Sequence, residues 1–208
     1  MSDAAQTPVV PLEAGAGPEN PPCPACGEPL FGWLAPRPGL RGPVSRCESC
    51  GLGVVGAPGE PAEALRELAR PGEDSPRIAN RASFAASLGS AGWAGLEPGA
   101  RYLFTVESAR RLVARRDQVV KSRRWAPAAS LAATWQTLLN SVTFGHNVAL
   151  AAFGRADAAK ATEAWQRRID GLASIVLALP ALIVALPIEL AGGLVGRGSV
   201  VTLRFELL

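Results

Sequence analysis

The amino-acid sequence predicts an α+β fold made of a small N-terminal β module and a mainly helical C-terminal module with a few strands. Three observations lead to this prediction. All four cysteines lie within residues 23–50, in two Cys-x-x-Cys pairs. Apolar residues recur at helical spacing over 106–116 and 129–143. Residues 199–207 alternate apolar and polar side chains, as a half-buried strand does.

Length and composition allow a sizeable core, since the chain has 208 residues of which 48% are hydrophobic. The net charge of +3 is too small to indicate a nucleic-acid partner by itself. Residues 101–124 do concentrate arginine and lysine, but few aromatic side chains are interleaved with them. The sequence therefore argues against nucleic-acid binding and favours an ordinary solvated basic face.

The cysteines form the strongest motif. Cys23 and Cys26 make one pair, Cys47 and Cys50 the other, and a glycine follows each pair. Two turns that each present two thiolates suit tetrahedral Zn²⁺. Four sulfur ligands leave no open position for water, so we expect a structural and not a catalytic zinc. A glycine at that position tolerates positive φ and frees backbone N–H groups to point at the sulfurs.

The first half of the chain divides by composition. Residues 1–20 are expected to be a disordered leader, without the basic and apolar regions of a signal peptide, which favours a cytoplasmic location. Residues 21–56 form the predicted zinc ribbon, and 57–79 a linker around one short helix that begins at Pro61. If the linker isolates the ribbon from the module at 80–208, loss of the metal should unfold the ribbon alone.

Within 80–208 the predicted elements follow from periodicity and capping signals. Leu131, Trp135, Leu138, Leu139 and Val142 form a helical stripe that we expect to pack in the core. The elements are a helix over 106–116 with Thr105 as N-cap, a strand over 118–125, a helix over 129–143, a helix from Asp157 to near Gly171, and a strand over 199–207.

An apolar segment over 172–195 allows two interpretations. Residues 172–188 carry no charge, and a straight helix of that length spans about 25 Å, short of the roughly 30 Å of a bilayer core. Pro180 and Pro187 would disturb such a helix. We expect a helical hairpin, buried or facing a membrane; a protein anchored through 172–195 is the alternative.

The order of these pieces resembles a known family. A ribbon ending in "RCESCGLGVV", followed by "NRASFAASLGSAGWAGLEPGARYLFTVESARRLV", is similar to class I S-adenosylmethionine-dependent methyltransferases of bacterial cell-surface and secondary-metabolite pathways. The resemblance covers roughly 20–55 and 78–208. Ten residues correspond to the family's second stretch: Asn80, Ser83, Gly89, Trp93, Leu96, Pro98, Tyr102, Phe104, Thr105 and Ser108.

The cofactor-binding half of that family is missing from the sequence. It needs a glycine-rich turn after the first strand and an acidic residue after the second. Only 22 residues separate Val55 from Ile78, and they contain no such strand and turn. The glycines of 191–198 follow an apolar helix, which is typical of a turn into a strand. His146, the one histidine, lies between two predicted helices.

We therefore assign no catalytic or cofactor-binding residue and do not expect S-adenosylmethionine to bind. The resemblance implies a degenerate, non-catalytic member that serves as a binding or accessory protein. A truncated sheet would present open edges to a protein partner or to a second copy. Two alternatives stay open: an active methyltransferase whose cofactor site is unrecognised or completed by a partner, and a membrane-associated zinc-ribbon protein.

Overall fold

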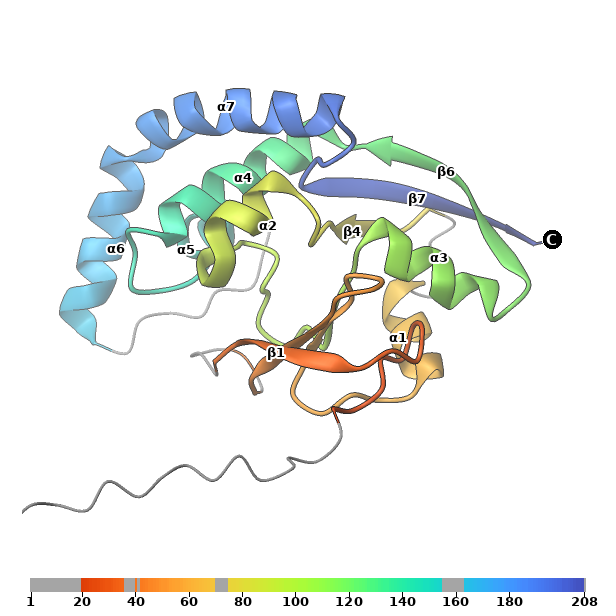
Figure 1. Ribbon diagram of the computed structural model, residues 1–208. Coiled ribbons are helices and arrows are strands. Elements are labelled where there is room, and N and C mark those ends of the chain that lie inside the picture. The colour runs from red at the N-terminus through yellow and green to blue at the C-terminus, as the bar shows by residue number, and fades with distance from the viewer. Residues whose placement is uncertain (1–19, 36–39, 41, 70–74, 155–162, 208) are drawn as a thin grey trace, which may run out of the picture.

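The computed structural model describes residues 20–35, 40, 42–69, 75–154 and 163–207. They form two antiparallel sheets with helices packed beside them, which confirms the α+β class (Figure 1). The first sheet has the strand order β1 (Leu30–Leu34), β2 (Val44–Cys47), β3 (Gly53–Val55) and β5 (Tyr102–Leu103). The second sheet has the order β4 (Arg77–Ala79), β7 (Val200–Leu207) and β6 (Gln118–Trp125).

The helices form two groups: α2, α4, α5, α6 and α7 gather at one end of the second sheet, and α1 and α3 pack together on the side of the ribbon (Figure 1). In Figure 1, α7 runs along α4, and α6 continues from the start of α7 down the edge of the molecule. The helices are α1 (Pro61–Leu68), α2 (Phe84–Gly89), α3 (Val106–Ala114), α4 (Pro127–Asn140), α5 (Val148–Ala152), α6 (Ala164–Val176) and α7 (Ala178–Leu194), with a short 3₁₀ turn at Ser90–Gly92.

Local signals placed several elements correctly. Helix α1 begins at Pro61, and β6 covers the whole of the strand predicted over 118–125. The N-cap of α3 is Thr105, whose side chain accepts a hydrogen bond from the N–H of Ser108 while Ser108 bonds back to the N–H of Thr105. This capping box satisfies two helix N–H groups that would otherwise lack partners.

The last strand lies in the middle of the second sheet. Val201 in β7 is paired with Ile78 of β4 on one side and with Trp125 of β6 on the other, both antiparallel. Strands β4 and β6 therefore run parallel to each other with β7 between them. The turn before β7 uses glycines, as expected: Gly196 has φ +72°, and Trp125 packs directly against Gly193 and Gly198.

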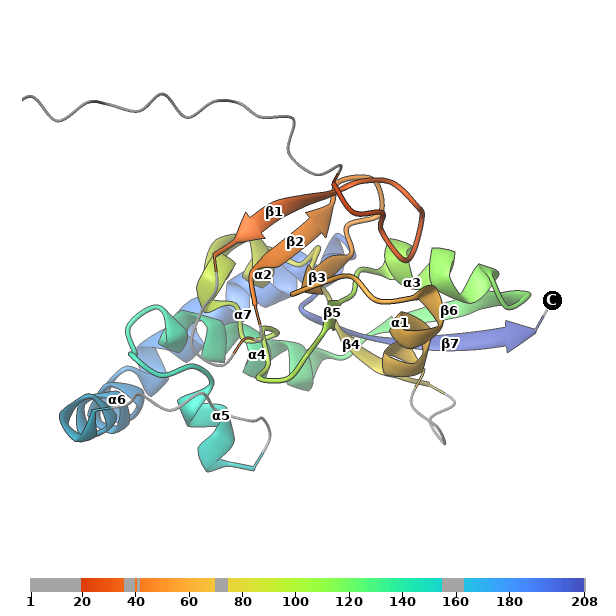
Figure 2. The ribbon, with the colours of Figure 1, turned by 90° about the horizontal axis from the view of Figure 1, so that it is seen from below.

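The ribbon shares its sheet and its core with the rest of the chain. Strand β5, which lies far along the sequence, pairs with β3 and completes the first sheet. Leu52 and Val54 of the ribbon belong to one buried cluster with Leu65 of α1 and Leu112 of α3. Figure 2 shows the ribbon strands β1 to β3 beside β5. The buried cluster contains residues from both sides of the boundaries expected at 56 and 79, so the core does not stop at them.

Helix α4 turns a different face inward from the one predicted. Leu139 of the expected apolar stripe is buried, but Val142 lies beyond the helix and is 50% exposed. The buried face is largely polar, with Ser130, Thr134, Gln136, Thr137 and Asn140. The reason is what α4 packs against: Ser130 exchanges hydrogen bonds with the N–H and C=O groups of Val200, and Thr134 bonds to Glu189 of α7.

The apolar segment differs from the expected hairpin. Helices α6 and α7 follow one another with a single bend of 61°. Pro180 falls in the first turn of α7, where proline is tolerated, and Pro187 lies inside the helix. Neither helix alone is long and apolar enough to cross a membrane, although the bent pair passes that test by length and composition. The expected start at Asp157 lies outside the described residues, and α6 runs past Gly171 to Val176.

Candidate metal centre

The two Cys-x-x-Cys pairs fold into two matching turns. In the first, Cys23 N–H donates to Glu28 O, and Gly27 N–H donates to Cys23 O at 2.8 Å. In the second, Cys47 and Gly51 occupy the equivalent positions, with Gly51 N–H donating to Cys47 O at 3.0 Å. Gly27 has φ +83° and Gly51 has φ +75°, as the sequence predicts for both glycines.

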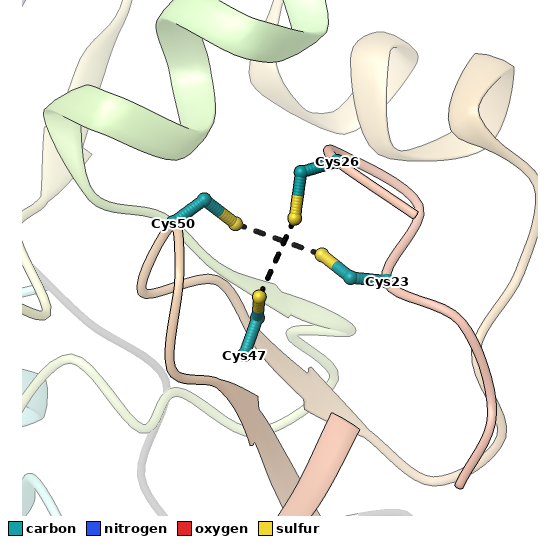
Figure 3. Close-up of side chains that lie close together, drawn as sticks. All are labelled: Cys23, Cys26, Cys47 and Cys50. Carbon is teal, nitrogen blue, oxygen red and sulfur yellow. Dashed lines mark hydrogen bonds between the residues drawn. The ribbon is translucent and has the colours of Figure 1, made fainter. Parts of the chain in front are cut away.

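The strands and turns of the first sheet bring the four cysteines of the two pairs together, as Figure 3 shows. All four sulfurs lie within 4.8 Å of one another. The Sγ atoms of Cys23 and Cys50 are 3.6 Å apart, and those of Cys26 and Cys47 are 3.4 Å apart. Three of the cysteines are buried and Cys26 is half-buried. The cluster is thus closed off from solvent on most sides.

This geometry fits a single tetrahedral metal ion. Four sulfurs at ~2.3 Å from a central ion stand about 3.8 Å from one another, close to the separations observed here. Among the described residues, these cysteines form the one group of three or more histidine, cysteine or acidic side chains close enough to share an ion. The four residues could therefore hold a metal, and the sulfur donor set favours zinc.

The surroundings favour a thiolate at Cys23, whereas the pKa values of Cys26 and Cys50 are raised. The thiol of Cys50 donates to Cys23 and lowers the pKa of Cys23 to about 5, while this contact and burial raise the pKa of Cys50. Backbone N–H groups also lower the pKa of their neighbours: those of Ala25 and Cys26 act on Cys23, and that of Leu52 acts on Cys50. Because Leu52 directly follows Gly51, the positive φ of the glycine is what turns this N–H toward the sulfur.

Two residues from beyond the ribbon hold the second turn in place. The hydroxyl of Thr105 donates to Cys50 O at 2.7 Å. The guanidinium of Arg81 donates to Gly51 O and stacks over the Trp33 ring at 5.1 Å. Burial lowers the pKa of Arg81, with the charge of Arg46 adding to the effect. Thr105 was identified from the sequence only as a helix cap, and the role of Arg81 was missed because its partners lie 30 and more residues away.

A second positive group lies at the surface beside the cluster. Arg111 of α3 donates to Ser49 Oγ at 3.0 Å and pairs with Glu107 at 2.9 Å. The pKa of Arg111 is raised mainly by its hydrogen bond to Glu107, with the Cys26 thiol as a weaker cause. Four thiolates around a divalent ion carry net negative charge. Arg111 and Arg81, which contact the second turn at Ser49 and Gly51, would offset that charge.

The residues on which the family resemblance rests have structural roles in this protein. The side chain of Asn80 donates to Gly198 O at 3.0 Å and accepts from the N–H of Ala82. Ser83 caps α2 through the N–H of Ala86, and Trp93 is only 1% exposed. These side chains join turns to strands and fill the core, which explains their residue types without a ligand.

Away from the cysteines, an open cleft of about 1060 Å³ lies between the two sheets. Its lining includes Arg77, Ile78 and Ala79 of β4, Glu67 of α1 and Tyr102 of β5. The sequence contained no signal for this cleft, because β4 and β5 come together only in the folded chain.

Comparison of the chain with known protein families, with curated proteins and with solved structures finds no match in any of the three.

Proposed function

We propose that this chain is a non-catalytic zinc-ribbon protein derived from a class I methyltransferase, and that it works as a binding or accessory protein. One observation carries the binding role: strand β4 lies at the edge of its sheet, against the open cleft. A sheet edge that faces a cleft is a template for an extended segment of another chain.

The hydrogen-bond register of β4 determines which of its backbone N–H and C=O groups could pair with a partner strand. Leu203 N–H donates to Pro76 O, and Asn80 N–H donates to Ser199 O, so the even-numbered residues of this stretch bond toward β7. In an antiparallel pair, the intervening residues direct their N–H and C=O groups the other way. Arg77 and Ala79 therefore direct theirs away from β7 and toward the cleft.

Several features of the cleft suit a peptide segment better than a small apolar ligand. The lining of the cleft combines the backbone of the edge strand β4 with polar side chains. The cleft is also open to solvent. The carboxylate of Glu67 already accepts from the N–H groups of Arg101 and Tyr102, both at 3.2 Å, so the β5 side of the cleft is covered. The β4 side is the one left for a partner strand.

The non-catalytic part of the proposal rests on what lies between the two sheets. In the described parts of 56–76, helix α1 is the one regular element, and the sequence of 56–76 contains no glycine-rich phosphate or nucleoside motif after a strand. Strands β4, β6 and β7 would then be the retained last strands of the family's sheet. The zinc would stabilise the fold, and any methyl transfer would be catalysed by another protein.

Calorimetric titration of S-adenosylmethionine into the zinc-loaded protein tests the non-catalytic role. We expect no heat of binding. Binding at micromolar strength would overturn this role and support the active methyltransferase, and mapping the bound cofactor would then show which residues complete its site.

The binding role is tested first with a second copy of the chain as the partner. Sedimentation velocity over a range of concentrations would detect self-association. Ala79→Pro removes the N–H group that faces the cleft, and Ala79→Ser is the matched control that retains it. Association that Ala79→Pro abolishes and Ala79→Ser preserves would support pairing through β4; a monomer at every concentration would exclude the second copy as the partner.

A further inference from the structure

Helices α6 and α7 expose a continuous apolar face, which we call the apolar arm and define as the exposed side chains between Trp165 and Val195. Thirteen large apolar residues in this stretch are at least 40% exposed, and Leu194 reaches 85% and Ile175 77%. Scattered exposed apolar residues are ordinary, but contiguous patches of this size mark a surface that something covers.

Charges are absent from the face of the arm for a structural reason. Between Ile169 and Leu194 the only ionisable residues are Asp170 and Glu189. Asp170 is 1% exposed and accepts from the N–H groups of Phe144 and Gly145, at 2.7 and 2.9 Å. Glu189 is 3% exposed and is bonded to α4 and β6. Both carboxylates face inward, so the outer face is left without charge.

The width of the arm indicates what covers it. Successive residues of an α-helix are about 100° apart, and the exposed residues of α7 include the neighbours Leu182, Ile183 and Val184 as well as Leu186 and Leu190. They cover roughly half of the circumference of the helix. A single partner helix would contact only a narrow stripe of α7, about two of every seven residues. Lipid acyl chains contact the whole arc, and they fit this face better.

Both ends of the arm carry side chains typical of a membrane interface. Trp165 is 55% exposed and stacks edge-on against Phe144, with ring centroids 5.4 Å apart. Arg168 follows on the next turn and is exposed. At the other end, the guanidinium of Arg123, an exposed residue, lies beside Gly196. Tryptophan prefers the headgroup region, and arginine attracts anionic headgroups.

The inner contacts of α7 decide between lying on a membrane and crossing it. A helix of 17 residues is about 25 Å long, short of the bilayer core. The Trp135 indole donates to Ala178 O at 2.8 Å, and Glu189 is bonded to Ser199 at the start of β7. Crossing a membrane would break these bonds, whereas lying on its surface keeps them and buries only the outer face.

We propose that the apolar arm docks on the surface of an anionic membrane, with acyl chains against α6 and α7 and with the arginines at its two ends among the headgroups. The body of the protein takes the place of the polar face that an isolated interfacial helix would need. This proposal does not depend on the accessory role, because it uses a different surface from the β4 edge.

Vesicle flotation of the full zinc-loaded chain tests the proposal. Vesicles of phosphatidylcholine with phosphatidylglycerol are compared with phosphatidylcholine alone, and we expect the protein to float with the anionic vesicles and more weakly with the neutral ones. Ile183→Asp places a charge on the arm at a 64% exposed position, and Leu207→Asp is the matched control, 72% exposed at the end of β7. Circular dichroism confirms that each variant is folded.

Because Ile183→Asp replaces an apolar side chain that the membrane would bury by a charged one, it should weaken vesicle binding at least about tenfold. Leu207→Asp should leave binding unchanged. Arg168→Gln should reduce binding to anionic vesicles only. The proposal is overturned if the wild-type protein stays at the bottom of the gradient with both vesicles, or if Leu207→Asp weakens binding as much as Ile183→Asp. A dimer in solution that Ile183→Asp dissolves, without flotation, would assign the arm to a second copy instead.

Discussion

The hydroxyl of Thr105 donates to the carbonyl oxygen of Cys50 over 2.7 Å, so the residue that caps α3 also holds the second cysteine turn. Thr105 follows β5, which itself completes the ribbon sheet. The cysteine cluster and the start of α3 are therefore one structural unit, although 55 residues separate Cys50 from Thr105 in sequence. A change at the cysteine cluster should therefore affect the stability of α3 as well, which it would not do in an independent ribbon.

Removing the metal should destabilise the whole chain and not the ribbon alone. Structural zinc contributes about 10 kcal/mol or more to folding in small modules, and at this chain length 1 kcal/mol corresponds to about 2–4 °C in Tm. We expect a chelator, or Cys47→Ser, to lower the Tm of the helical signal by more than about 10 °C. Glu48→Gln, at an exposed position in the same turn, is the control. Two separate thermal transitions would instead support the prediction that the linker isolates the ribbon from the rest of the chain.

Replacing Thr105 should weaken both the cap and the link to the ribbon. Thr105→Ala removes the acceptor for the N–H of Ser108 and the donor to Cys50, and an N-cap alone is worth about 1–2 kcal/mol. Thr105→Ser retains both bonds and serves as the matched variant. Urea denaturation measures the difference; equal stability of the two variants would show that the hydroxyl contributes nothing.

The two tryptophans expected to lie in the core should behave differently. Trp93 is 1% exposed, and Trp93→Ala should cost about 3–5 kcal/mol. Trp135 is half-buried, with its indole bonded to Ala178, so Trp135→Ala should cost clearly less. Denaturation curves of the two variants give the comparison. A larger loss of stability for Trp135→Ala would mean that the contact of Trp135 with α7 stabilises the fold more than the partial burial of this side chain indicates.

Glu189 should matter more to stability than its single charge suggests. It accepts hydrogen bonds from Trp125, from Thr134, and from both the N–H and the hydroxyl of Ser199. Glu189→Gln replaces Oε2, the charged acceptor for the hydroxyls of Thr134 and Ser199, by an NH2 group. Both hydroxyls must then turn to accept, and the charge-assisted hydrogen bonds become neutral ones, at a cost of about 3 kcal/mol. The control is Glu206→Gln, an exposed partner of Lys121, where the loss should stay below about 1 kcal/mol. Similar losses at both positions would contradict the buried network.

Local patterns in the sequence determined much of the secondary structure and identified the four cysteines of the cluster. Pro61, Thr105 and the alternation after Ser199 act on their immediate neighbours, so they place element ends without knowledge of the fold. The two Cys-x-x-Cys turns are equally local, because four residues and one glycine complete each turn. That the two pairs should meet was expected from the preference of four thiolates for one shared ion, and their sulfurs do lie within 4.8 Å of one another.

Burial could not be predicted in the same way, because it depends on what each element meets. Helix α4 has an apolar stripe by periodicity, yet it buries Thr134 and Ser130 since Glu189 and β7 supply polar partners there. The apolar segment after Gly171 was expected to form a hairpin, and only the bonds of Glu189 and Trp135 explain why α7 runs straight along α4 with its outer face exposed.

By itself, then, the sequence determined where helices and strands begin, which four sulfurs form the cluster and where charge is lacking, because these depend on residues within a few positions of one another. The tertiary structure alone decided that β5 joins the ribbon sheet, that Arg81 and Thr105 support the cysteine turn, and that β4 and the apolar arm face outward. Those outcomes arise from contacts between segments 30 or more residues apart, whose energies no local pattern records.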